Sequence, residues 1–157
     1  MGRVVSVDEL EKELAVRPHE RVVLTNGCFD LLHAGHLATL RHAASLGDTL
    51  VVGLNSDSSV ARLKGPDRPF IGQKDRAELL AALDPVDYVV VFDEPDPEAL
   101  IARIKPHVHV KGGDYAPDEL PEADLVRSYG GEVVIAEEVP GKSTSELVAK
   151  IRGEAAG

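Results

Sequence analysis

The feature that most constrains the fold of this chain is a regular alternation of apolar runs with helix-like segments. The apolar runs are rich in Val, Leu and Ile, and they span residues 21–25, 49–54, 88–92, 108–110 and 132–136. Between and after them, apolar residues recur every three or four positions, at about residues 35–46, 74–83, 97–105, 119–129 and 143–152. This pattern predicts strands that alternate with helices along the chain.

Continuous apolar strands separated by helices are typical of a parallel sheet that is buried on both faces. We therefore expect an α/β fold, a Rossmann-like five-stranded parallel sheet with helices on both faces. The chain has 157 residues, 43% of them hydrophobic, which suits one domain over residues 1–157 and is too short for two comfortable ones. A further short helix after Ser6, with Glu9 at capping-box spacing, would cover one side of the sheet.

The composition argues against several classes of partner. A formal net charge of −10 disfavours nonspecific binding to nucleic acid or to an anionic membrane, because both need a basic surface. Cys28 is the only cysteine, which excludes an internal disulfide and fits a reducing compartment. No apolar stretch approaches the length that spans a bilayer. We therefore expect a cytoplasmic protein whose anionic ligands meet local positive charge.

Ligands of open parallel sheets bind beyond the carboxyl ends of the strands. The segments in question follow the first, second, fourth and fifth strands, and they comprise residues 26–36, 55–68, 111–115 and 141–145. The second of them opens the longest expected loop, which runs to about residue 73 and carries several cations. All four segments are expected to converge on one crevice.

The first of these segments, Thr25-Asn26-Gly27-Cys28-Phe29-Asp30-Leu31-Leu32-His33-Ala34-Gly35-His36, joins a strand to a helix. Backbone N–H groups in the first turn of a helix have no partner within the helix and favour a phosphate. His33 and His36 would flank that position, and Gly35 would allow a ligand to approach closely. Two surface histidines are an alternative interpretation. Zinc is another, but the chain does not obviously supply the remaining ligands.

Each of the other segments also has two interpretations. Lys111-Gly112-Gly113-Asp114-Tyr115 is either an ordinary turn or a place where a flat base meets the backbone. Ser143-Thr144-Ser145 is either a helix cap or a phosphate site, because both use the same N–H groups. Asp57 and Lys64 form either a solvated strand-end pair or part of the crevice. Arg76 opposes the dipole in the first turn of a helix, which hints at an anionic ligand.

His33-Ala34-Gly35-His36, preceded by Gly27-x-Phe29-Asp30, resembles the HxGH signature of the nucleotidyltransferase superfamily. The other matching segments are Asn55-Ser56-Asp57, Arg62-Leu63-Lys64-Gly65-x-x-Arg68-Pro69, Lys111-Gly112-Gly113-Asp114-Tyr115 and Gly141-x-Ser143-Thr144-Ser145. Together they are similar to the adenylyltransferases of ADP-heptose synthesis, which occur as stand-alone domains and as the C-terminal half of a fused kinase–adenylyltransferase. The likeness covers a core of about residues 21–152.

This resemblance implies transfer of AMP from ATP to a sugar 1-phosphate, heptose 1-phosphate, with release of ADP-heptose and pyrophosphate. It also implies Mg²⁺ carried mainly by the nucleotide phosphates, no protein metal ligand, and a homodimer. His33, His36 and Lys64 would be catalytic. The implied nucleotide-binding residues are Asn26, Gly27, Cys28, Phe29, Gly35, Arg68, Lys111, Gly113, Asp114, Ser143, Thr144 and Ser145, and the implied substrate-binding residues are Asp30, Asp57, Arg76 and Lys142.

Two alternatives stay open at this point. The first is a cytidylyltransferase acting on glycerol 3-phosphate or a related polyol phosphate. Those relatives usually carry an Arg-Thr-x-Gly-Ile-Ser-Thr-Thr segment, whereas residues 138–145 here read Glu-Val-Pro-Gly-Lys-Ser-Thr-Ser and lack the arginine. The second alternative is a nucleotide-sensing domain that binds ATP without turning it over.

Overall fold

The computed structural model describes residues 2–113, 116, 119–136 and 143–153. In chain order the elements are β1 (Arg3–Val4), α1 (Val7–Ala15), β2 (Val22–Gly27), α2 (Ala34–Ala44), β3 (Thr49–Asn55), α3 (Asp57–Lys64), α4 (Gln73–Ala81), β4 (Tyr88–Phe92), α5 (Glu98–Ile104), β5 (Val108–Gly112), α6 (Ala123–Ser128), β6 (Glu132–Ala136) and α7 (Thr144–Ile151).

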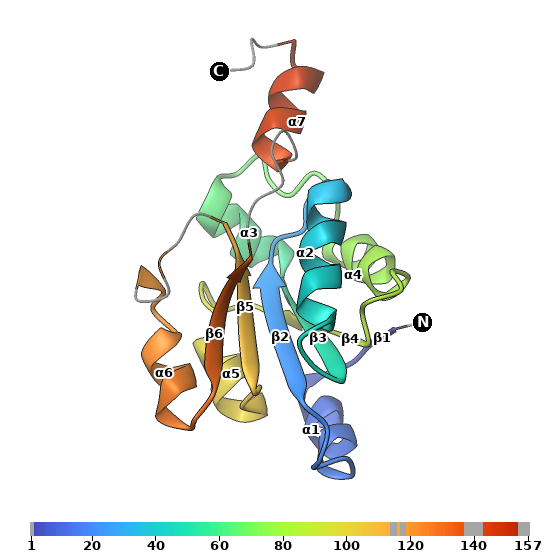
Figure 1. Cartoon of the computed structure of the whole chain (residues 1–157). Helices are drawn as coiled ribbons and strands as arrows, with labels where there is room; N and C mark the ends of the chain where they lie inside the picture. Colours follow the sequence, from blue (N-terminus) through green and yellow to red (C-terminus); the bar gives the residue numbers. More distant parts are fainter. Residues whose placement is uncertain (1, 114–115, 117–118, 137–142, 154–157) are drawn as a thin grey trace.

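One sheet of parallel strands organises the molecule, in the order β1-β4-β3-β2-β5-β6 (Figure 1). The α/β fold is thereby confirmed, but the sheet has six strands rather than the five expected. The additional strand, β1, consists of two exposed residues that pair with Tyr88 and Val89 of β4. A strand of two exposed residues is too short to show as an apolar run in the sequence. Its stability comes from pairing with β4 at the edge of the sheet.

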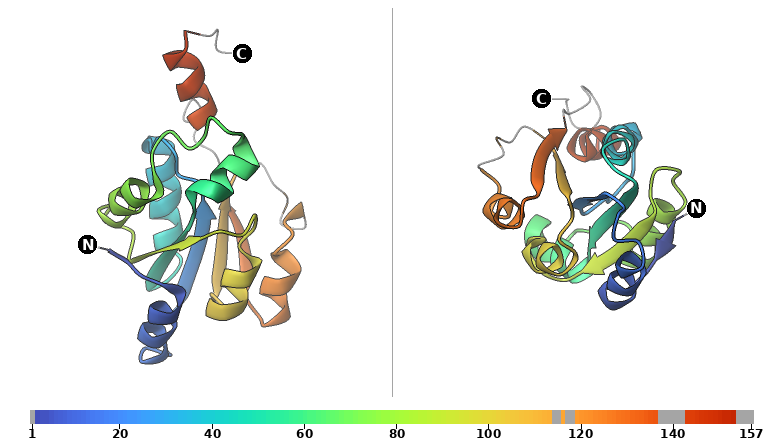
Figure 2. Two further views of the ribbon diagram at one scale, coloured as in Figure 1. Left: turned by 180° about the vertical axis from the view of Figure 1, so that it is seen from behind. Right: turned by 60° about the horizontal axis from the view of Figure 1, so that its bottom comes forward.

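Helices cover both faces of the sheet, as expected. On one face, Leu40 of α2 and Leu80 of α4 are fully buried in a core with the strands. On the other face, Leu10 of α1, Ile101 of α5 and Val126 of α6 form a second core. Helix α2 lies in front of the sheet in Figure 1, and α5 lies in front in the view from behind (Figure 2).

The order of the strands determines where a ligand can bind. The chain runs from β2 to β3 and β4 on one side of the sheet, and then crosses to β5 and β6 on the other side. Such a reversal between β2 and β5 opens a crevice at their carboxyl ends, where the helices that follow leave in opposite directions. Helix α7 lies beyond the same end of the sheet (Figure 1).

The segment between β3 and α4 differs from its expected conformation. Residues 57–64 form helix α3, whereas the sequence suggested an uninterrupted loop to about residue 73. Ser56 caps this helix by accepting a hydrogen bond from the Ser59 N–H, and Gly65 ends it with a φ of 108°. Ser59 and Val60 are its buried residues, so the apolar periodicity that reveals a helix in a sequence is missing. Among the described residues no helix is long and apolar enough to cross a bilayer.

Candidate active site

A cavity of about 500 Å³ opens at the carboxyl ends of β2 and β5, in the crevice that the topology predicts. It is lined by all the described residues that the sequence marked as catalytic or nucleotide-binding: Asn26, Gly27, Cys28, Phe29, His33, Gly35, His36, Lys64, Arg68, Lys111, Gly113, Ser143, Thr144 and Ser145. Asp114 and Lys142 lie outside the described residues. Of the expected substrate-binding residues, Asp30 lines the cavity, whereas Asp57 and Arg76 do not.

Two lining residues of the cavity, Thr39 and Pro95, lie outside the segments that the sequence marked, whereas Thr25, Asn55, Leu63 and Gly112 lie within those segments. Asn55 ends β3 and Pro95 follows β4, so the crevice reaches across the sheet as far as the loop after β4. The sequence could not show this, because it does not reveal that β3 and β4 lie next to β2. Thr39 belongs to α2, and its hydroxyl donates to the Gly35 carbonyl oxygen (3.2 Å).

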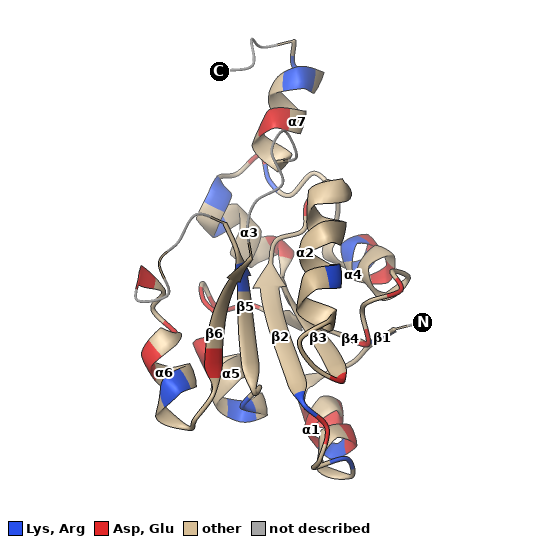
Figure 3. Ribbon diagram, viewed as in Figure 1, with Lys and Arg blue, Asp and Glu red and all other residues tan. Residues whose placement is uncertain are grey.

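Positive charge gathers at this opening although the whole chain is acidic. Figure 3 shows basic segments at the carboxyl end of β5 and at the end of α3. The lining cations are Lys64, Arg68 and Lys111, and Asp30 is the one carboxylate among the described lining residues. An acidic protein with a local cationic opening attracts an anionic ligand to that opening alone.

His33 and His36 form a reciprocal cap at the start of α2. The His33 Nδ1 accepts a hydrogen bond from the Gly35 N–H (3.0 Å), and the His36 Nδ1 accepts one from the His33 N–H (3.2 Å). The helix therefore begins within the motif, at Ala34, rather than after it. The ring centroids lie 4.0 Å apart, so the two imidazoles stand next to each other at the mouth of the cavity.

These caps also determine where each ring carries its hydrogen. A neutral imidazole has one N–H donor and one acceptor nitrogen, and in both rings Nδ1 is the acceptor. The hydrogen then belongs to Nε2. Burial, followed by the neighbouring His33 ring, lowers the pKa of His36 to about 4. His36 is therefore a neutral hydrogen-bond donor near pH 7 rather than a cation.

Asp30 lines the cavity and also bonds groups within the protein, while its expected role as a substrate ligand stays a prediction. Its carboxylate is buried and accepts hydrogen bonds from the Arg68 Nε (2.8 Å) and from the N–H groups of Phe70 and Ile71 (2.8 and 3.0 Å). Burial raises the pKa of Asp30, but these hydrogen bonds outweigh that effect and lower it below its ordinary value. Asp30 therefore fastens the loop before α4 and holds Arg68 at the cavity.

Arg76 also bonds groups within the protein, and its expected contact with an anionic ligand stays a prediction. The side chain is 1% exposed. Its Nε donates to the Ile71 carbonyl oxygen (2.7 Å), and its Nη1 donates to the carbonyl oxygens of Cys28 (2.7 Å) and Asn55 (2.8 Å). Its Nη2 pairs with the half-exposed Asp57 (2.7 Å). Its charge is neutralised inside the protein, and it holds three backbone segments together beneath the site.

The amino end of α7 completes the cavity wall. Ser143 caps the helix by accepting a hydrogen bond from the Glu146 N–H (3.1 Å), as the sequence predicts. The Thr144 hydroxyl donates to the Asp30 carbonyl oxygen (3.2 Å), which ties α7 to the segment after β2. Helix α7 has no fully buried residue. This wall is therefore joined to the rest of the protein by contacts at the cavity rather than by packing in either core.

Comparison with known proteins places this arrangement in a family. The model of the cytidylyltransferase-like family matches residues 24–151. The chain belongs to this family. The match confirms that the HxGH motif lies in a nucleotidyltransferase domain, and it includes all the strands except β1 and the first residues of β2.

Other members and solved structures agree with this assignment. The cytidylyltransferase-like chain is 57% identical over 152 residues to the bifunctional protein HldE of Geobacter sulfurreducens, and 56% identical over 132 residues to that of Pelobacter propionicus. These matches cover 96% and 84% of this chain but only 31% and 27% of the relatives, so the chain spans about a quarter to a third of their length.

Two crystal structures have the same fold. A lipopolysaccharide core biosynthesis protein from Thermoplasma volcanium is 30% identical, with a TM-score of 0.61, and the match covers 76% of this chain and 97% of that one. Pantothenate synthetase from Thermus thermophilus is 21% identical, with a TM-score of 0.54 over 88% of this chain and 62% of that one. The second likeness concerns the fold alone.

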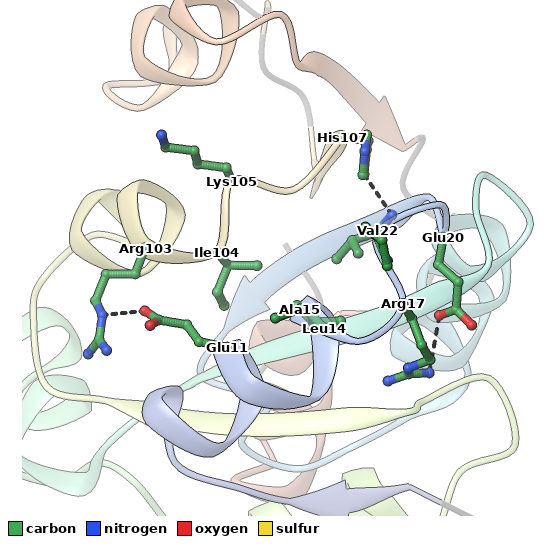
Figure 4. A pocket seen from close by; sticks show the side chains of 11 residues that line it. Glu11, Leu14, Ala15, Arg17, Glu20, Val22, Arg103, Ile104, Lys105 and His107 are labelled. Atoms are coloured by element: carbon green, nitrogen blue, oxygen red, sulfur yellow. Dashed lines mark hydrogen bonds and ion pairs between the residues drawn. The ribbon is translucent and has the colours of Figure 1, made fainter.

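A second cavity of the cytidylyltransferase-like chain, of about 380 Å³, lies at the opposite end of the sheet, between the ends of α1 and α5 (Figure 4). Two of its lining cations have carboxylate partners: Arg103 pairs with Glu11 (2.6 Å) and Arg17 with Glu20 (3.1 Å). Cations that already have carboxylate partners attract anions weakly. Open parallel sheets also bind ligands at the carboxyl ends of the strands rather than at this end, so the first cavity is the candidate active site.

The neutral His36 predicts a pH dependence of stability. A histidine in the unfolded chain titrates near pH 6.5, whereas folded His36 titrates at about 4, so the unfolded state binds the proton first as the pH falls. The stability that neutral His36 contributes is complete above pH 6.5 and is lost towards pH 4. We expect this group to lower the free energy of unfolding by up to about 3 kcal/mol over that range.

Urea unfolding at a series of pH values measures this effect. His36→Asn should flatten the pH dependence of the unfolding free energy between pH 6.5 and 4, whereas His42→Asn, at an exposed position of the same helix, should leave it unchanged. The same slope in the wild type and in His36→Asn would contradict the prediction.

Proposed function

We propose that this chain transfers AMP from ATP to heptose 1-phosphate, giving ADP-heptose and pyrophosphate. Its identity of 57% to a bifunctional HldE protein over nearly its whole length supports this assignment. The sequence motifs that resemble the adenylyltransferases of ADP-heptose synthesis support it as well. A solved relative of similar size is named for lipopolysaccharide core biosynthesis, which agrees with an activated sugar as the product.

The observation that carries the proposal is the set of groups gathered in the first cavity. Two histidine rings with their hydrogens on Nε2, three cations and the amino end of α7 all line one space. Together they form a surface complementary to several phosphate groups, because N–H donors and positive charges face the same volume. A triphosphate and a sugar phosphate both bring such groups.

The reaction needs little acid–base chemistry from the protein. An oxygen of the sugar phosphate attacks the α-phosphorus of ATP in line, a new P–O bond forms, and the bond to the leaving pyrophosphate breaks. The attacking oxygen is already anionic near neutral pH, so no general base is required. Catalysis then consists of positioning and of stabilising negative charge.

In this proposal His33 and His36 donate hydrogen bonds to the triphosphate through Nε2. Lys64, Arg68 and Lys111 neutralise the charge that develops during transfer, and the amino end of α7 holds a terminal phosphate. Asp30 contributes indirectly by orienting Arg68. Mg²⁺ that arrives on the triphosphate oxygens would supply further charge neutralisation.

The family match leaves the cytidylyltransferase alternative without particular support. The family name covers the whole cytidylyltransferase-like group, whereas the high-identity relatives are bifunctional HldE proteins. The arginine with which the glycerol-phosphate enzymes begin this segment is absent from residues 138–145.

Pyrophosphate release tests the proposal directly, with ATP and CTP each combined with heptose 1-phosphate or glycerol 3-phosphate. We expect kcat/KM to be roughly 10²-fold or more higher for ATP with heptose 1-phosphate than for any other pair, because a site built to hydrogen-bond its ligand rejects analogues that leave its polar groups unpaired. A preference for CTP with glycerol 3-phosphate would establish the cytidylyltransferase instead. Calorimetric ATP binding without pyrophosphate release from any pair would establish a sensing domain.

A further inference from the structure

A buried acid–imidazole pair lies in the sheet directly beneath the cavity. His109, on β5, is 0% exposed, and its Nε2 lies 2.9 Å from the Oε1 of Glu122, whose side chain is 3% exposed. Neither residue lines the candidate active site. The pair therefore has no direct part in ligand binding, and its presence needs another explanation.

The pair is costly for a protein interior. Burial raises the pKa of Glu122, but the hydrogen bond from His109, a backbone hydrogen bond and the nearby His109 and Lys111 together outweigh this, so the pKa is lowered and the carboxylate is ionised. The Nδ1 of His109 makes no hydrogen bond within the described residues, which adds a further desolvation cost. Well-packed apolar side chains often replace such a buried pair without loss of stability. Folding alone therefore does not require it.

The location of the pair indicates what it does. Side chains two apart on a strand project from the same face, so His109 lies one step below Lys111 on β5. Glu122 is the residue that precedes α6. Between them runs the connection from β5 to α6; Gly112, the last residue of β5, and Gly113, which follows it, both line the cavity. The hydrogen bond thus joins the strand before this connection to the residue that ends it.

We propose that His109 and Glu122 are positioning residues, which hold the connection from β5 to α6 so that Lys111, Gly112 and Gly113 stand correctly toward the nucleotide. This inference rests on the proposed function, in which Lys111 neutralises charge on the nucleotide and Gly112 and Gly113 line the same cavity. The pair acts through the backbone and the Lys111 side chain, and neither His109 nor Glu122 touches the ligand.

A second polar contact of α6 provides a matched comparison. At the other end of this helix the Tyr129 hydroxyl donates to the Pro106 carbonyl oxygen (2.7 Å). The partly buried Tyr129 side chain packs against the core that contains Ile101 and Val126. Both contacts tie the α6 region to the β5 region. Of these two contacts, only the one through Glu122 lies next to the cavity. Variants that each lack one contact therefore show whether nucleotide binding depends on the position of the contact or on the general stability of the protein.

The test compares the double variant His109→Leu/Glu122→Met with the wild type and with Tyr129→Phe. We expect the double variant to keep the wild-type melting temperature or to exceed it, because two apolar side chains replace a buried pair. Its Kd and KM for ATP should nevertheless rise roughly tenfold, with the KM for heptose 1-phosphate changed by less than about threefold. The single variant Glu122→Gln keeps an acceptor for His109, so it should retain most of the wild-type affinity for ATP. Tyr129→Phe should lower the melting temperature and leave the KM for ATP unchanged.

If the double variant binds ATP within twofold of the wild-type affinity, the inference is overturned. If the double variant does not fold, the ATP affinity of Glu122→Ala relative to the wild type decides by the same twofold limit. The activity of the wild-type protein tests the proposed function separately. The nucleotide affinity of each variant relative to the wild type is measured with ATP or with CTP, whichever the wild type turns over. A change of nucleotide therefore revises the function and still tests the pair.

Discussion

Replacing His36 with asparagine is expected to lower kcat/KM for nucleotidyl transfer by roughly 10²–10³-fold while the protein stays folded, which is the usual effect of removing one hydrogen-bond donor that meets developing charge. An asparagine Oδ1 occupies nearly the position of the histidine Nδ1, so it can still accept the His33 N–H and keep the cap of α2. The donor that histidine carries on Nε2 is lost. The variant therefore separates the contribution of His36 to the reaction from its contribution to the start of α2.

Glutamine at the same position is the complementary variant. Its Nε2 amide reaches nearly as far as the imidazole Nε2, so His36→Gln should retain part of the activity. It should lose the cap, with a loss of about 1 kcal/mol in the free energy of unfolding. His42→Asn, at an exposed position of α2, is the control for both. Steady-state pyrophosphate release and urea unfolding measure the two effects, and near-normal turnover by His36→Asn would exclude a role for its donor in the reaction.

The largest expected loss of stability follows from Arg76→Lys. A lysine ammonium cannot reproduce the planar fork that bonds three carbonyl oxygens and Asp57 at once. At least one or two buried carbonyl groups would be left unpaired. We therefore expect the free energy of unfolding to fall by about 2–4 kcal/mol and the melting temperature to fall by roughly 10 °C.

Two controls isolate the cause of this loss. Arg41→Lys, at an exposed position of α2, should change the unfolding free energy by less than about 0.5 kcal/mol. Asp57→Asn removes the ion pair but leaves an acceptor for Arg76, so it should cost less than Arg76→Lys. Thermal and urea unfolding measure all three variants. If Arg76→Lys were as stable as the wild type but bound the sugar phosphate weakly, Arg76 would be a ligand of the substrate after all.

The parts of the structure that the sequence predicted are those set by local pattern. The strand, the glycine-bearing turn and the helix around His33 follow one another within a few residues, and each has its own local signal. The alternation of apolar runs with helical segments implied a parallel sheet, and the rule for carboxyl ends then brought distant loops together. Nearly all the cavity residues that were named in advance come from these two inferences.

The parts that could not be predicted depend on partners far away in the chain. Asp30 and Arg76 carry charges suited to binding a ligand, yet their partners lie on segments that only the fold brings together. The same holds for His109, which stands between two valines in a strand and gives no sign of the acid at position 122. Pro95 was missed because the order of strands within the sheet is a tertiary property.

The bonds of Arg76 have a consequence for how the protein opens. One side chain of α4 holds the carbonyl groups of Cys28, Asn55 and Ile71, which follow or end three different segments around the cavity. A local unfolding event that lifts α4 from the sheet releases all three at the same moment. The site and α4 therefore form one cooperative unit of partial unfolding, while α7, which buries none of its residues, can detach without disturbing either core.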